Sequence, residues 1–304
     1  MLVFATSDKG GTGRSVTSAN IVYRAALDGA NACYLDFDFG SPTAGAIFHL
    51  GDYSRGAQGG IGMHSYLVDG GANPASVNIW DRSDRAGLRG RPRGAGRLTL
   101  YPGDEGRGEF GSSAAVVDRC ARLLGRLDEE YDLCLVDLSA GRSFATDIVL
   151  EAMQTARLEA TDARWLVFHR WTRQHIIAAN GLVYGAGGIL ANGEQRGHDR
   201  TTLERSLRFV RTAYVDPDSP SLDGLRTEQI AWLHNLNREL HVLAGDHGLG
   251  QTTMLGSVPL DPVLQWREQL LLNEDTHRKV ANEATVAAFE ELARQVRKDA
   301  WETL

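Results

Sequence analysis

A cluster of glycines near the start of the sequence is the first feature that could do chemistry. The stretch KGGTGRS, residues 9–15, places three glycines between Lys9 and Arg14, after the apolar run Leu2–Thr6 and before the helical pattern Ser15–Leu27. Glycines let the backbone bend so that its N–H groups point inward, and a helix N-terminus adds its positive dipole end. A strand, a glycine-rich loop and a helix in this order favour a phosphate-binding site. A glycine turn without a ligand is the alternative.

Two carboxylates each end an apolar run that is typical of a buried strand. Asp38 ends ACYLDFD, residues 32–38, and Asp137 ends YDLCLVD, residues 131–137. Ligands of parallel sheets bind beside the carboxyl ends of the strands, so we expect both side chains to lie near the glycine loop. Strand-end carboxylates that only cap a turn are the alternative.

Short apolar runs alternate with longer helical patterns along the whole chain. Besides the runs already named, we predict strands at Arg97–Gly103, Arg164–Arg170, Leu207–Val215 and Thr252–Pro259. We predict further helices at Ala114–Glu130 and about Glu283–Trp301. Such alternation predicts an α/β fold with a mostly parallel sheet and helices on both faces. We expect residues 1–304 to form a single domain.

Two stretches interrupt this alternation of strands and helices: a glycine-rich loop at residues 51–62 and an arginine-rich stretch at residues 81–96. The arginines of the second stretch are Arg82, Arg85, Arg89, Arg91 and Arg93. We predict a flexible, solvated insertion here; a docking surface for an acidic partner or nucleic acid is the alternative. The net charge of −7 does not favour DNA binding, which depends on neutralising phosphates.

The overall composition predicts a cytoplasmic protein. Hydrophobic residues make up 42% of the 304 residues, enough for a large core, and three widely spaced cysteines suit buried thiols better than disulfides. The N-terminus lacks the basic region of a signal peptide, and we find no apolar run of about 18 residues, so we expect no transmembrane segment.

Three motifs, in order, resemble those of one protein family. KGGTGRS resembles the deviant Walker A motif, K-G-G-x-G-K-[ST], of the ParA/MinD family of P-loop ATPases. CYLDFDFGSP, residues 33–42, looks like the family's second motif, and YDLCLVDLSAG, residues 131–141, resembles its Walker B strand and second switch. The resemblance covers essentially the whole chain and implies the P-loop fold, ATP and Mg²⁺ as ligands, and a nucleotide-dependent homodimer that acts on a protein partner.

The resemblance also implies roles for individual residues. Lys9 would reach across the dimer to the partner's phosphates, and Asp38 would orient the attacking water, which makes these two the catalytic candidates. The expected metal ligands are Ser15, Asp38 and Asp137. The expected nucleotide-binding residues are Lys9, Gly10, Gly11, Thr12, Gly13, Arg14, Ser15 and Val16 at the loop, with Pro259 and Asp261 framing the base.

Arg14 is the main departure from the family pattern, which has lysine there. Arginine is a planar fork that can bind phosphate, but it does not replace lysine at a tight site. We therefore predict that nucleotide binding is retained and hydrolysis is slow. Two other functions stay open: a non-hydrolysing, nucleotide-stabilised scaffold or regulator, and an ATP-dependent metabolic ligase on the same fold.

Overall fold

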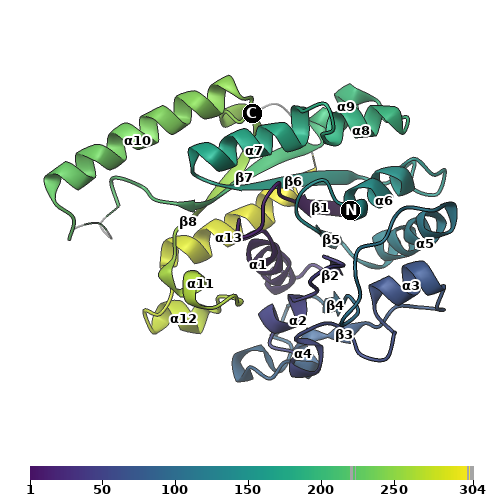
Figure 1. Ribbon diagram of the computed structural model, residues 1–304. Helices are drawn as coiled ribbons and strands as arrows, with labels where there is room; N and C mark the ends of the chain where they lie inside the picture. The colour runs from purple at the N-terminus through teal and green to yellow at the C-terminus, as the bar shows by residue number, and fades with distance from the viewer. Residues whose placement is uncertain (220–221, 223, 300, 302–304) are drawn as a thin grey trace.

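An eight-stranded sheet runs through the molecule (Figure 1). The structure is a computed structural model that describes residues 1–219, 222, 224–299 and 301. The strand order is β3-β4-β2-β5-β1-β6-β7-β8, and all neighbours pair in parallel except β3 with β4. This confirms the predicted α/β fold.

The elements have the following bounds. The strands are β1 Leu2–Thr6, β2 Ala32–Phe37, β3 Val77–Asn78, β4 Leu98–Tyr101, β5 Leu133–Leu138, β6 Ala163–Arg170, β7 Leu207–Tyr214 and β8 Met254–Pro259. The α-helices are α1 Arg14–Leu27, α2 Ala44–Ile47, α3 Met63–Asp69, α4 Ile79–Arg82, α5 Ala114–Glu130, α6 Phe144–Met153, α7 Arg173–Tyr184, α8 Ile189–Gln195, α9 Arg200–Arg205, α10 Thr227–Asp246, α11 Pro262–Trp266, α12 Asn273–His277 and α13 Glu283–Val296. Short 3₁₀ turns lie at Gly51–Tyr53, Ala86–Leu88 and Gln251–Thr253.

The central strand β1 explains how the core is divided. Successive side chains of a strand point to opposite faces, so Phe4 packs with one apolar cluster and Val3 with the other. The Phe4 side is covered by α5, α6 and α7, and the Val3 side by α1 and α13 (Figure 1). Both faces of β1 are buried, which explains why its residues are continuously apolar and do not alternate between apolar and polar.

The arginine-rich stretch is built into the surface. Trp80 of α4 and Leu88 of the following turn are buried, and Arg85 forms a two-pronged ion pair with Asp275 at 2.6 and 2.7 Å. Other arginines of the stretch contact Asp52, Asp84, the Ser83 carbonyl and the Ala95 carbonyl. Most of these charges already have partners inside the chain, whereas flexibility and nucleic-acid contact of this stretch stay predictions.

One stretch, residues 173–195, is long and apolar enough to cross a membrane by length and composition, and its most apolar 18-residue window has a mean hydropathy of 1.2. The structure divides it into α7 and α8, with a turn at Gly185–Gly188 between them, and somewhat under half of its most apolar window is buried. Buried helices of globular domains pass the same test, so this is weak evidence for a span.

Candidate functional site

The glycine loop connects β1 to α1 and is open to solvent. Gly11 and Gly13 have φ values of 70° and 74°, a left-handed conformation that glycine adopts without strain. A Cβ at Gly10 or Gly11 would meet nothing within 4 Å. Because α1 has no side-chain cap, the first N–H groups of this helix lack a side-chain acceptor, which is the arrangement that binds anions.

A hydrogen bond from β7 fixes the base of this loop. The Thr212 hydroxyl donates to the Thr12 carbonyl at 2.5 Å and lies 3.2 Å from the His169 carbonyl on β6. All three groups are buried. These hydrogen bonds therefore connect the loop to β6 and β7, a contact that no sequence motif predicted.

The predicted carboxylates, Asp38 and Asp137, lie at the carboxyl ends of β2 and β5 together with Asp36, which the sequence analysis did not single out. Asp36 accepts hydrogen bonds from the backbone N–H groups of Asp38 (3.2 Å) and Ala44 (3.1 Å), so its side chain holds the turn after β2. Burial, together with the nearby charge of Asp137, raises the pKa of Asp36 to about 8. Burial also raises the pKa of Asp38, against the opposing effect of Arg14.

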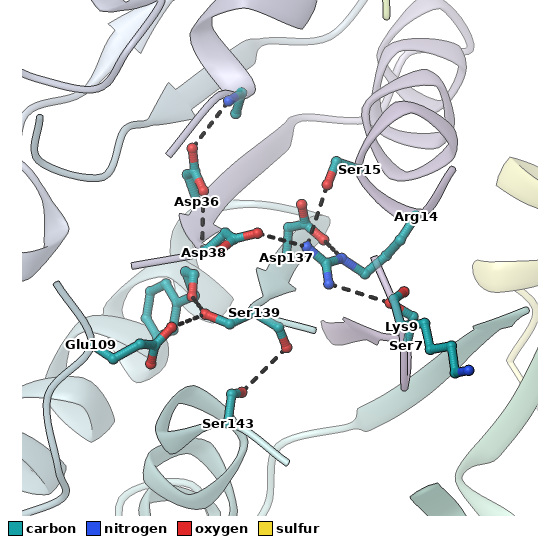
Figure 2. A network of polar contacts seen from close by, with 12 residues as sticks. Ser7, Lys9, Arg14, Ser15, Asp36, Asp38, Glu109, Asp137, Ser139 and Ser143 are labelled. Carbon is teal, nitrogen blue, oxygen red and sulfur yellow. Dashed lines mark hydrogen bonds and ion pairs between the residues drawn. The ribbon is translucent and has the colours of Figure 1, made fainter. Parts of the chain in front are cut away.

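Arg14 lies in the middle of these groups (Figure 2). Its Nε–H donates to Asp137 Oδ1 at 2.5 Å, and Nη2 donates to Asp38 Oδ2 at 3.1 Å. Nη2 also lies 3.4 Å from the Ser15 hydroxyl, and Nη1 lies 3.4 Å from the Ser7 hydroxyl. The side chain is thus turned into the carboxylate cluster, and only 6% of the residue is exposed.

A buried tyrosine completes the surroundings of Asp137. The Tyr34 hydroxyl donates to Asp137 Oδ2 at 2.6 Å, so both oxygens of this carboxylate are engaged. Burial and the charge of Asp137 raise the pKa of Tyr34 well above its ordinary range. Burial alone would lower the pKa of Arg14, but Asp137 and Asp38 outweigh it and the pKa is raised, so the guanidinium stays charged.

The metal ligands expected from the sequence do come together, but around a guanidinium. Ser15, Asp38 and Asp137 each contact Arg14. Mg²⁺ requires near-octahedral oxygen ligands at about 2.0–2.1 Å, and a guanidinium offers donors only. The residues present therefore do not fit a resident Mg²⁺, and no cluster of three or more His, Cys, Asp or Glu suited to a metal occurs in the described part of the chain.

The remaining predicted residues lie around this centre. The Lys9 side chain extends away from the carboxylates (Figure 2), and among the described residues it forms no ion pair. The Val16 side chain is buried in the core, which leaves its backbone to face the loop. Pro259 ends β8, three strand spacings from β1, or roughly 14 Å at about 4.8 Å per strand. Asp261 is buried and accepts from the N–H groups of Val263 and Asn282, so its side chain fixes the turn after β8.

The sequence analysis missed several polar partners. Ser139 donates to Glu109 Oε1 at 2.5 Å and lies 3.2 Å from the Phe37 carbonyl, which ties the loop after β5 to β2. Tyr34 did carry a signal, because a polar group two residues before Asp36 lies on the same face of the strand. Ser7 and Glu109 carried none.

The sequence matches no protein-family model and no curated protein. Its structure is similar to that of a putative plasmid partition protein from Borrelia burgdorferi bound to AMPPNP (TM-score 0.60, 11% identity, 97% of this chain and 98% of that chain). The fold is that of ParA and MinD proteins.

Two further structures support that assignment of the fold. The MinD cell division protein of Aquifex aeolicus aligns with a TM-score of 0.55 at 17% identity, over 97% of this chain and 95% of that chain. A ParA family ATPase from Chlorobium tepidum aligns with a TM-score of 0.54 at 14% identity, over 96% and 98%. These matches cover 96–97% of this chain.

Proposed function

We propose that this chain is a ParA/MinD-like switch that binds ATP at the glycine loop and dimerises through it. The observation that carries the proposal is the open loop at the uncapped start of α1, where exposed glycines leave room for a polyphosphate. The Borrelia protein with this fold binds AMPPNP, which supports a nucleotide as the ligand. MinD of Aquifex forms a complex with MinC, which supports a protein partner.

In this proposal the loop residues bind and orient the nucleotide. Backbone N–H groups of Gly10, Gly11 and Gly13 contact phosphate oxygens, and Lys9, which extends away from its own carboxylates, acts on the phosphates of the partner subunit. Asp38 orients water, and Pro259 lies at the edge where the base would be framed. We expect hydrolysis to be slow, because Arg14 and Asp38 bind each other, and one missing donor at such a site typically costs about 10²–10³ in rate.

The test is molecular mass in solution by light scattering with ATP, with ADP and without nucleotide. We expect the wild type to dimerise with ATP and Lys9→Ala to stay monomeric. Lys298→Ala, an exposed lysine near the end of α13, is the matched control and should behave as wild type. A wild-type mass that does not change with ATP would contradict the proposal.

A non-hydrolysing, nucleotide-stabilised regulator is the second candidate, and the ion pairs of Arg14 favour it. Single-turnover hydrolysis with enzyme in excess separates the two. Product from wild type but not from Asp38→Asn supports the ATPase. No product from wild type supports the regulator.

A further inference from the structure

The groups that the family resemblance assigns to Mg²⁺ hold an arginine of the same chain. We propose that the Arg14 guanidinium is the built-in cation of this site, and that the chain binds its nucleoside triphosphate without a divalent metal. This inference rests on the proposed function and specifies the ionic form of its ligand.

The guanidinium satisfies each group that would otherwise bind the ion. It contacts Asp137, Asp38 and the Ser15 hydroxyl, and both oxygens of Asp137 already accept a hydrogen bond, Oδ1 from Arg14 and Oδ2 from Tyr34. A metal ion at Asp137 would have to compete with an ion pair and a buried hydroxyl for these oxygens.

Displacement of Arg14 by a metal ion is strongly unfavourable, because the buried guanidinium cannot lose its charge. Arg14 is buried, and an arginine side chain does not lose its proton in proteins. A divalent ion would repel the guanidinium and compete for the carboxylates that compensate its charge inside the protein. Arg14 therefore competes directly with a metal for the same oxygens.

The remaining donor of Arg14 lies on the loop side. A guanidinium has five N–H groups, and the contacts to Asp137, Asp38, Ser15 and Ser7 use four of them. The fifth is on Nη1, the nitrogen nearest Ser7, and Ser7 directly follows β1 where the glycine loop starts. Arg14 can thus offer a charged donor to a phosphate oxygen while it keeps its carboxylates.

Lysine at this position should undo the arrangement. Its ammonium is a compact point charge with three donors rather than a planar fork with five, so we expect oxygens of Asp38 and Ser15 to become available to a metal. Arg14→Lys is therefore expected to make nucleotide binding dependent on Mg²⁺. Arg24→Lys is the matched control, because Arg24 is also a buried, ion-paired arginine of α1 but contacts Asn273 and Glu290 instead.

The experiment measures the Kd for ATP by calorimetry, with excess Mg²⁺ and with excess EDTA, for wild type and both variants. We expect the wild-type and Arg24→Lys values to differ by less than about threefold between the two buffers, and Arg14→Lys to bind at least about tenfold more tightly with Mg²⁺. As a second readout, each protein is loaded with ATP and Mn²⁺ and desalted. Only Arg14→Lys should retain a stoichiometric amount of manganese.

Two kinds of result would overturn a claim, and they are distinguishable. Wild type that binds ATP about tenfold more tightly with Mg²⁺, or that retains Mn²⁺, contradicts the inference and leaves the proposed function standing. Wild type that binds ATP in neither buffer contradicts the proposed function and the inference together. Both results come from wild type, so they hold even if Arg14→Lys fails to fold.

Discussion

Replacing Asp137 by Asn tests whether the buried ion pair with Arg14 contributes to stability. The side chains are 2% and 7% exposed, and their atoms lie 2.5 Å apart. Removing one partner of a buried pair typically costs about 3–5 kcal/mol, because the other charge stays behind in a dry environment. Asp38 still pairs with Arg14 in the variant, so we expect the lower end, about 3 kcal/mol.

The assay is urea unfolding of the nucleotide-free protein at neutral pH. The control is Asp118→Asn, which breaks the exposed pair with Arg122 on α5 and should cost no more than about 0.5 kcal/mol. Arg14→Met removes the other charge while keeping a long side chain. Because the two residues are in contact, Arg14→Met with Asp137→Asn should cost about 2 kcal/mol less than the sum of the single changes.

Two results would refute this reasoning. If Asp137→Asn costs no more than the exposed control, the pair is not buried in solution. If the two changes at Arg14 and Asp137 are additive, the residues do not interact, and the position of the guanidinium described above is wrong.

Two further predictions concern stability. Asp36 has a pKa of about 8 in the fold against an ordinary value of 3.8, so the folded state binds the proton more tightly, and stability should fall as pH rises through that window. From pH 6 to pH 8 we expect the free energy of unfolding, measured with urea, to fall by about 2 kcal/mol in wild type and not in Asp36→Asn. The same pH dependence in both proteins would contradict this prediction. Gly13→Ala places a side chain on a residue with left-handed backbone and should destabilise the fold by about 1–2 kcal/mol. Gly10→Ala, at an unstrained and open position, should cost less. Equal losses of stability in thermal unfolding would argue against this loop geometry.

Much of the fold could be predicted because the sequence patterns are strong. The strand Leu2–Thr6 and the helix Ala114–Glu130 have their predicted bounds, since an apolar run between polar residues and an amphipathic period are local properties. The strand expected from Thr252 begins at Met254, after a 3₁₀ turn. The helix expected to reach about Trp301 ends at Val296, and residues 300 and 302–304 lie outside the described chain. The two-residue strand β3 was missed because it is defined by its antiparallel pairing with β4 rather than by its own sequence.

The candidate site shows where sequence reasoning ends. That Asp38 and Asp137 would approach the glycine loop follows from topology, because parallel strands end at one edge. The direction of the Arg14 side chain does not follow from any motif. It depends on acceptors 24 and 123 residues away in the chain, and on the hydroxyl of Tyr34 that holds Asp137 in place. A motif fixes the backbone of such a loop, while the rotamer of a long cation is set by distant partners.

The central place of β1 has a consequence for how the chain is made. Of the eight strands of this sheet it is the first to be synthesised, yet its neighbours are β5 and β6, which end at Leu138 and Arg170. Until the ribosome has released the chain as far as β5, the apolar residues of β1 have no strand to pair with. Nascent chains that stop before β6 should therefore depend on chaperones, and the sheet can close only late in translation.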